Sequence, residues 1–255
     1  MRKFVMGDVH GAFKALKQCL ERSAFDYNND LLIQLGDVAD GYDQVYECVE
    51  ELLAIKNLIA IKGNHDEWFN QFCQTGYHEQ HWSQGGKGTV NAYTKNKGKK
   101  PNLIASKLFG FNGNIEAADI PDTHKSFFKR QLLYHVDEAK NCFVHAGFNR
   151  HESFYEQRDQ NYYWDRSLFV DAMEYELLKK KLPDITFEMV TPFNKIYIGH
   201  TPTISWKADE PIVVSNVVNM DTGAGWGARL SMINLDTNEL IQSDPVTELY
   251  GYRGR

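Results

Sequence analysis

The chain has 255 residues, 42% of them hydrophobic, which suffices for one large domain with a substantial core. Its 28 basic and 34 acidic side chains give a formal charge of -6, which argues against a protein that coats nucleic acid. No apolar run approaches the roughly 18 residues of a membrane span, and the start of the chain lacks the apolar core of a signal peptide.

We therefore expect a cytoplasmic protein with neither a nucleic-acid nor a membrane partner. Four scattered cysteines without a CxxC pair are typical of buried free thiols in a reducing compartment. The oligomeric state is left open.

The first part of the chain contains three predicted strands, at residues 3–6, 31–35 and 58–62, and each is followed by a polar loop. Helical periodicity follows the first two, at 12–22 and 43–56, with Asp43 as the predicted N-cap of the second helix. Open α/β sheets bind ligands in the loops at the carboxyl ends of their strands. The pattern therefore places a ligand site at these loops.

The rest of the chain has a different pattern. Residues 67–140 are aromatic and polar, which predicts a helical cap inserted into a single domain of residues 1–255. Within this segment we interpret GGKGT, at 85–89, as a flexible turn. Strands are predicted near the C-terminus, at 195–200, 211–221 and 228–243.

Five polar motifs each follow a predicted strand: GDVHG (7–11), GDVAD (36–40), GNHD (63–66), HAG (145–147) and GHT (199–201). They supply carboxylates, an amide and imidazoles, the mixture that a pair of divalent cations needs. Any one motif is common by chance, as a turn with a capping side chain. All five in order at strand ends indicate a metal site.

This set resembles the signature of the calcineurin-like metallophosphoesterases. The likeness is greater to the bacterial and phage-type phosphoprotein phosphatases, whose relatives include symmetrical diadenosine tetraphosphate hydrolases. It extends from Gly7 to Thr201, and NMDTGAGWG (219–227) continues it. The resemblance implies an α/β fold, a four-layer αββα sandwich with a helical cap insert, and two divalent metal ions. Manganese is the expected metal, with iron, zinc, nickel or magnesium as alternatives.

The resemblance also implies roles for individual residues. The implied metal ligands are Asp8, His10, Asp37, Asn64, His145 and His200. Asp37 would bridge the two ions, and a water that they activate would attack phosphorus. His65 would be the general acid for the leaving oxygen, and Asp40 would hydrogen-bond and orient it.

The substrate phosphate would be held by Asn64 and by Arg166, which lies in YYWDR at 162–166. The same stretch has an alternative interpretation as the N-terminal cap of the helix that follows it.

This chain departs from the family pattern after Asp40. A second phosphate-binding arginine is expected there, but Gly41 stands in its place and leaves room beside the metals. Possible replacements, among which the sequence does not choose, are Lys62, Lys87 and Arg150.

Three functions remain open. The first is a phosphatase that hydrolyses phosphomonoesters, with phosphoserine, phosphothreonine or phosphotyrosine proteins as substrates. The second is a hydrolase of nucleotides or dinucleoside polyphosphates. Four cap aromatics could then stack a base, although core packing is the favoured use of each: Trp68, Phe69, Tyr77 and Trp82. The third is an inactive metal-bound binding module, against which the intact Asp40–His65 pair argues.

Overall fold

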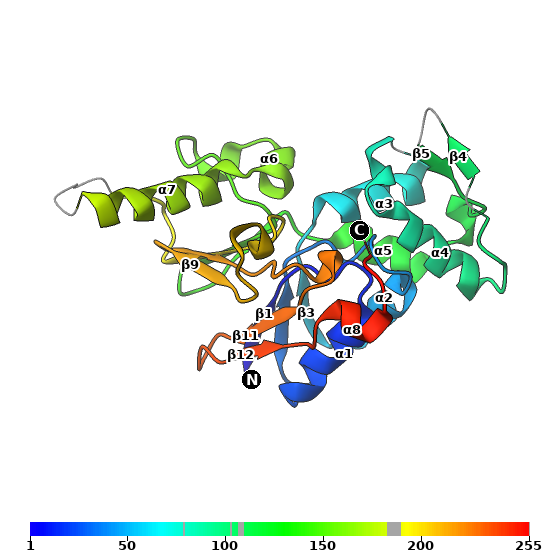
Figure 1. Ribbon diagram of the computed structural model, residues 1–255, viewed down its shortest axis with the longest axis horizontal. Coiled ribbons are helices and arrows are strands. Elements are labelled where there is room, and N and C mark those ends of the chain that lie inside the picture. Colours follow the sequence, from blue (N-terminus) through cyan, green and yellow to red (C-terminus); the bar gives the residue numbers. More distant parts are fainter. Residues whose placement is uncertain (79, 103, 107–109, 183–189, 255) are drawn as a thin grey trace.

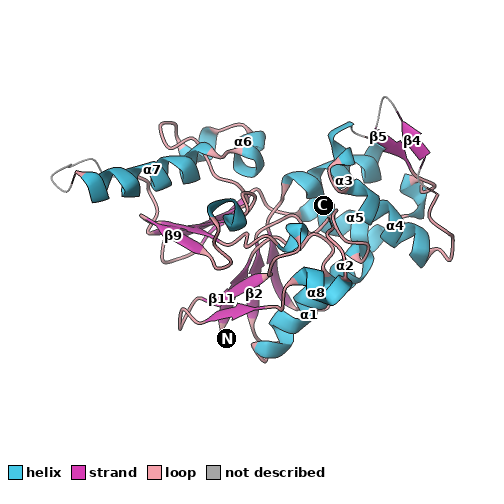
Figure 2. Cartoon of the chain, in the orientation of Figure 1, coloured by secondary structure: helices cyan, strands magenta, loops and turns pink. Residues whose placement is uncertain are grey.

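Two five-stranded sheets form the centre of the molecule (Figures 1 and 2). The computed structural model describes residues 1–254 except 79, 103, 107–109 and 183–189. The first sheet has the order β12-β11-β1-β2-β3. Its strands are β1 (Lys3–Met6), β2 (Leu31–Gln34), β3 (Asn57–Ala60), β11 (Ser231–Asn234) and β12 (Leu240–Gln242). The three N-terminal strands are parallel, with Val5 opposite Ile33 and Ile33 opposite Ile59.

The second sheet has the order β6-β7-β8-β10-β9. Its strands are β6 (Tyr134–Val136), β7 (Asn141–Val144), β8 (Lys195–Ile198), β9 (Ile212–Val214) and β10 (Val217–Asn219). The strand structure predicted at 211–221 is confirmed as two strands, because the chain reverses within this stretch. Ser215 takes a left-handed conformation with a φ of 53°, and β9 pairs antiparallel with β10.

Helices cover the outer face of each sheet. α1 (Phe13–Arg22), α2 (Val45–Leu53) and α8 (Val246–Tyr250) pack on the first, and α7 (Ser167–Lys181) contacts the second beside α6 (Asp159–Trp164). The prediction of Asp43 as an N-cap is wrong. The second helix starts only after Gln44, and the Asp43 carboxylate instead accepts hydrogen bonds from Lys95 and Tyr252.

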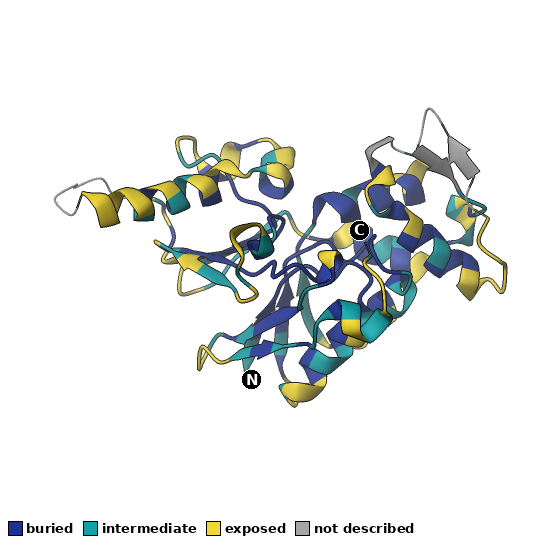
Figure 3. Cartoon of the chain, in the orientation of Figure 1, coloured by how far each residue is buried: buried dark blue, intermediate teal, exposed yellow. Residues whose placement is uncertain are grey.

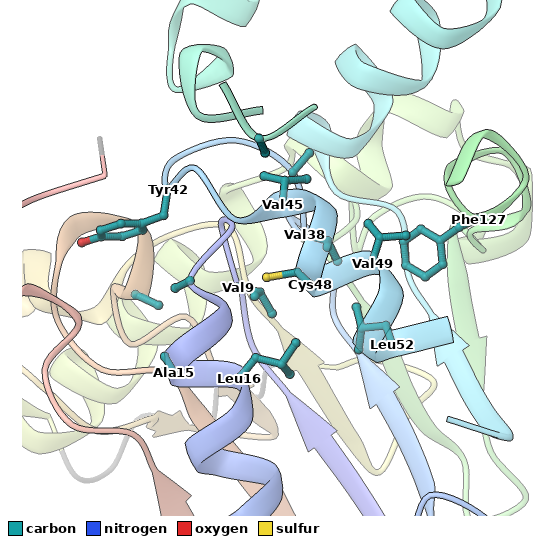
Figure 4. Close-up of a cluster of buried hydrophobic side chains, with 14 of the residues drawn as sticks. Val9, Ala15, Leu16, Val38, Tyr42, Val45, Cys48, Val49, Leu52 and Phe127 are labelled. Atoms are coloured by element: carbon teal, nitrogen blue, oxygen red, sulfur yellow. The ribbon is translucent and has the colours of Figure 1, made fainter. Parts of the chain in front are cut away.

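Three clusters of buried side chains define four layers. Val5, Ile33 and Phe143 belong to the cluster between the two sheets. A second cluster fills the space between the first sheet and its helices and includes Leu16 of α1 and Val49 of α2 (Figures 3 and 4). The third lies under α7. The αββα architecture expected from the sequence is therefore confirmed.

The remaining helices lie together beside the first sheet (Figure 1). We call α3 (Asn64–Thr75), α4 (Gly86–Asn96) and α5 (Asp122–Arg130) the helical lobe. Phe69 is fully buried at its centre, with its ring centroid 5.0 Å from that of Phe128 and 5.1 Å from that of Tyr93. Phe69 is thus a core residue and is not available to stack a base. The division into a domain and a cap at 67–140 stays a prediction.

Shorter elements complete the described chain. They are the hairpin β4 (Ile104–Ser106) and β5 (Gly110–Asn112), and the 3₁₀ turns η1 (Gln80–Ser83), η2 (Ala117–Asp119), η3 (Phe154–Glu156), η4 (Thr203–Trp206) and η5 (Ala224–Trp226). Among the described residues, no helix combines the length and apolar character needed to cross a membrane. All four cysteines are buried and free.

Candidate metal centre

The loops that follow β1, β2, β3, β7 and β8 meet at the carboxyl ends of their strands, between the two sheets. They bring together all six ligands implied by the sequence, and each is at most 8% exposed: Asp8, His10, Asp37, Asn64, His145 and His200. The first four come from the first sheet and its loops, and the two remaining histidines come from the second.

Two groups of possible ligands can be distinguished. One contains Asp8, His10 and Asp37, and the other contains Asp37, His145 and His200. Within each group the ligand atoms lie within 4.8 Å of one another. The Oδ1 atom of Asn64 lies 2.9 Å from Nδ1 of His200 and 3.3 Å from Nε2 of His145. Asp37 is common to both groups, as a bridging ligand would be.

The backbone is held in unusual conformations at this site. His10, Asp37, Asp40 and His200 have φ values of 48°, 53°, 71° and 68°, in the left-handed region that side chains other than glycine rarely adopt. Such conformations cost of order 1–3 kcal/mol each and concentrate at functional sites. The strained conformations indicate that these side chains are held in fixed positions at a cost in backbone conformational energy.

Asp8 shows that the site fits a cation. Its Oδ2 atom accepts a hydrogen bond of 3.0 Å from the backbone of His200, but its buried Oδ1 atom has no hydrogen-bond partner. Burial raises the pKa of Asp8 well above its usual value, and the carboxylates of Asp221 and Asp37 add to the effect. A divalent ion would satisfy Oδ1 and offset the repulsion, and carboxylate, amide and imidazole donors suit such an ion.

Imidazoles balance the charge of the shared carboxylate. Burial acts to raise the pKa of Asp37, but His145, His65 and His10 outweigh it and hold that pKa well below its usual value. Burial would likewise lower the pKa of His145, but Asp37 reverses this and raises it to about 10. Asp37 is thus held as a carboxylate at the centre of the site.

The pair implied as general acid and orienting carboxylate is formed. Nδ1 of His65 lies 2.7 Å from Oδ2 of Asp40, and both side chains are buried. Two side chains beyond the predicted set support Asp40 through its other oxygen. Trp82 donates its indole N–H at 2.8 Å, and Thr89 donates its hydroxyl at 2.6 Å. Trp82 is therefore a fully buried positioning residue instead of a base-stacking one.

Gly41 is packed too tightly for a side chain. Its φ is 79°, and a Cβ atom would lie 2.8 Å from the carbonyl oxygen of His10. Its N–H donates to the carbonyl of Gly85, and Gly88 is so close that a Cβ there would lie 2.3 Å from the carbonyl oxygen of Gly41. The expected room beside Gly41 and the expected flexible turn at 85–89 are both wrong. The GGKGT segment begins α4 and closes over this loop.

Asp66, the last residue of GNHD, holds the loop after β2 in place through hydrogen bonds. One carboxylate oxygen accepts the backbone N–H groups of Val38 and Ala39, at 2.8 and 2.9 Å. The other accepts the amide of Gln131 at 2.7 Å. Burial and the nearby Asp37 raise the pKa of Asp66 to about 6. The motif contained this residue, but its role required knowledge of the fold.

Arg166 reaches the site from the second sheet's side. Its Nε atom donates to Nε2 of His200 at 3.2 Å, and Asp165 caps α7 by accepting the N–H of Leu168 at 3.0 Å. The interpretation of YYWDR as a helix cap is therefore confirmed for Asp165, and the phosphate-binding role of Arg166 stays a prediction.

The three possible replacements for the missing arginine have other surroundings. Lys62 forms an ion pair of 2.5 Å with Glu67, and Arg150 one of 3.0 Å with Asp171. Lys87 is exposed and lines a separate cavity near Trp226. In the part of the chain that the structure describes, Arg166 is hydrogen-bonded through its side chain to the candidate metal ligand His200.

Comparison with known proteins agrees with this geometry. The family model for calcineurin-like phosphoesterases matches residues 1–211, so the chain belongs to that family and is a hydrolase. The symmetrical bis(5'-nucleosyl)-tetraphosphatase of Pseudomonas fluorescens is 24% identical, over 94% of this chain and 93% of that protein. The asymmetrical bis(5'-nucleosyl)-tetraphosphatase PrpE of Oceanobacillus iheyensis is 25% identical, over 94% of this chain and 91% of its own length.

Solved structures share the fold. A crystal structure of a candidate diadenosine tetraphosphatase superposes with a TM-score of 0.63 at 14% identity, covering 94% of this chain and 92% of that one. The cold-active protein-tyrosine phosphatase of a psychrophilic Shewanella gives a TM-score of 0.51 at 16% identity, covering 94% and 77%. At these identities the likeness establishes the architecture alone.

Proposed function

We propose that this protein hydrolyses phosphoester and phosphoanhydride bonds of small phosphorylated substrates, with dinucleoside polyphosphates as the first to test. The observation that carries the proposal is the pair of ligand groups sharing Asp37, next to the Asp40–His65 pair. The full-length similarity to two bis(5'-nucleosyl)-tetraphosphatases supports this choice of substrate.

Each residue has a role in this proposal. Asp8, His10, Asp37, Asn64, His145 and His200 hold two divalent ions, which when bound polarise the phosphoryl group and activate water. Asn64 and Arg166 hold the phosphate. The Nδ1–H of His65 donates a hydrogen bond to Asp40, and its Nε2–H gives the proton that the leaving oxygen takes up. Trp82 and Thr89 fix Asp40, so that the acid does not rotate out of line.

The proposed cofactor is manganese, and the proposed location of the protein is the cytoplasm. Mixed oxygen and imidazole donors accept Mn²⁺, although Zn²⁺, Fe²⁺ and Ni²⁺ suit imidazole as well. Four buried free thiols support a reducing compartment. Elemental analysis of protein purified without added metal tests the first point.

Phosphoproteins are the second candidate substrate. Trp164 and Arg166, next to the ligands, are exposed, and this favours access by a substrate larger than a nucleotide. An inactive binding module is disfavoured, because such a module needs no hydrogen-bonded acid next to its metals.

The test is a panel of substrates and metals. Diadenosine tetraphosphate, phosphoserine and phosphotyrosine peptides, and p-nitrophenyl phosphate are each assayed with Mn²⁺, Ni²⁺, Mg²⁺ and Zn²⁺. We expect turnover of diadenosine tetraphosphate with the highest kcat/KM in Mn²⁺. A higher kcat/KM for phosphopeptides would select the second candidate, and no turnover of any substrate with any metal would reject both.

A further inference from the structure

A cavity of about 230 Å³ lies beside the candidate metal centre, where α3 and α6 face one another. Figure 1 shows α6 beside α7 on the side of the second sheet and α3 with the helical lobe on the side of the first. The aromatic residues Trp68, Tyr163 and Trp164 line the cavity together with Glu67, Gln71 and Gln160. The amide nitrogen of Gln71 donates to Glu67 at 3.3 Å, so its carbonyl oxygen is the atom left for a ligand. Asn64, a candidate metal ligand, forms part of the same wall. The cavity and the ligand groups are therefore continuous.

The aromatic wall connects the general acid to the second ligand group. The ring centroid of Trp68 lies 4.7 Å from that of His65 and 5.5 Å from that of Trp164. Trp164 in turn lies 5.7 Å from His200. A leaving group whose oxygen meets His65 would consequently extend over these two indoles.

The two indoles differ in accessibility. Trp68 is 7% exposed and forms a fixed wall, whereas Trp164 is 41% exposed and presents a free face. The cavity is smaller than the roughly 300–1,000 Å³ of pockets for drug-sized ligands, so it admits one ring system. A phosphoserine or phosphothreonine side chain has no group that would use an aromatic wall.

We propose that this cavity is a nucleobase subsite, in which the base stacks on Trp164 while Gln71 and Gln160 contact its polar edge. Bases stack on aromatic side chains irrespective of sequence, and glutamine amides pair with the donor and acceptor edge of a base. This inference rests on the proposed function, since it names the substrate part that the site recognises.

The first experiment measures binding without turnover. AMP and ribose 5-phosphate, which share everything but the base, are titrated into Mn²⁺-loaded His65→Asn protein, whose turnover is slow, and followed by tryptophan fluorescence. We expect AMP to bind more tightly by roughly 5- to 150-fold, the worth of base–aromatic stacking. Equal affinity for the two compounds overturns the proposal. Phenyl phosphate that binds as tightly as AMP also overturns it, because the subsite would then be one for simple aryl groups.

The second experiment locates the contact. Trp164→Ala should remove most of the preference for AMP, and Trp164→Phe should restore part of it, because phenylalanine still stacks. Gln160→Ala should narrow the preference among AMP, UMP and CMP. Trp226→Ala is the matched control, since Trp226 is also 41% exposed and lies outside the cavity. Full AMP preference in Trp164→Ala overturns the proposal.

A third measurement separates this proposal from the proposed function. With Mn²⁺ added, Trp164→Ala should lower kcat/KM for diadenosine tetraphosphate by roughly 5- to 150-fold. For glycerol 2-phosphate, which has no base, the loss should stay under about threefold. Equal losses on both substrates would reject the base subsite and leave the hydrolase intact. If wild type turns over no phosphoester, the proposed function fails, and the AMP comparison still decides the subsite.

Discussion

The two sides of the candidate site are held in different ways. On the first-sheet side, side chains from the helical lobe fix the catalytic loops. Asp66 of α3 fastens the backbone at Val38 and Ala39, and Thr89 of α4 fixes Asp40. On the second-sheet side, the histidines are tied across to the first sheet instead. Nδ1 of His145 lies 2.7 Å from the carbonyl oxygen of Leu35.

Because the two sides are held differently, substitutions on each side should have different effects on proton donation and on metal binding. The general acid depends on the lobe, so changes there should impair proton donation while both ions stay bound. The second-sheet histidines depend on contacts with the first sheet's loops, so the shared carboxylate between them should control metal content. Asp37, Asp40 and Thr89 therefore offer three distinct ways to test the comparison.

Asp37→Asn should have the largest effect, because Asp37 is common to both ligand groups. Both ions should bind more weakly, and kcat/KM should fall by more than roughly 10³-fold, since metal activation supplies several kcal/mol to such reactions. Elemental analysis and turnover are measured together. Asp122→Asn is the control, because that side chain is fully exposed on α5. Two tightly bound ions with normal turnover in Asp37→Asn would contradict the shared role.

His65→Asn should cause the next largest loss of activity. Hydrolysis of substrates with poor leaving groups should slow by roughly 10²–10⁴-fold, the usual worth of a general acid, while both ions remain. The loss should be smaller for p-nitrophenyl phosphate, whose leaving group hardly needs a proton. Rates are compared across leaving groups of different pKa, with His135→Asn in β6 as the control. A uniform loss would argue that His65 is not the acid.

Local sequence patterns were enough to predict β1, β2, β3 and the five strand-end motifs, whereas the layered fold was implied by the family resemblance. Each motif directly follows an apolar run, and the carboxyl ends of parallel strands meet by geometry alone. The supports of Asp40 could not be predicted in this way. Trp82 and Thr89 are 42 and 49 residues from Asp40, and only the packing of η1 and α4 brings them close.

The role of the GGKGT segment was missed for a related reason. Its glycines look like those of a mobile turn, but Gly88 is required by the close approach of the Gly41 carbonyl. A sequence shows that a glycine is present and does not show what lies against it. The same limit applies to Gly41, where the sequence does not show that an added Cβ would lie 2.8 Å from the carbonyl oxygen of His10.

Thr89→Val should have a moderate effect that is confined to the first-sheet side. The variant removes one hydrogen bond to the Asp40 carboxylate and one from its backbone N–H. We expect kcat to fall about tenfold, equivalent to ~1.4 kcal/mol, with both ions retained. Thr94→Val is the matched control, since Thr94 is also buried in α4 but bonds to Asn114 instead.

A positioning role for Thr89 is again identified by measuring how the rate depends on the pKa of the leaving group. Thr89→Val and Trp82→Phe should both steepen the dependence of rate on leaving-group pKa, because His65 is no longer held in line. A change in stability alone, with the dependence unaltered, would make the two residues structural.

Gly41→Ala is a test of folding stability instead of turnover, and it measures how tightly the loop after Asp40 packs against the loop that carries His10. Gly41 and Gly98 both have left-handed backbones, with φ values of 79° and 68°, so alanine costs about 1–2 kcal/mol at either position. A Cβ at Gly98 meets nothing within 4 Å, whereas one at Gly41 lies 2.8 Å from the His10 carbonyl oxygen. Overpacking of this kind costs a further ~1–3 kcal/mol. Urea unfolding of the two variants, compared with wild type, isolates the contact, because the backbone penalty is common to both. Equal stabilities would mean that the loop after Asp40 yields easily to a side chain and is not packed tightly against His10.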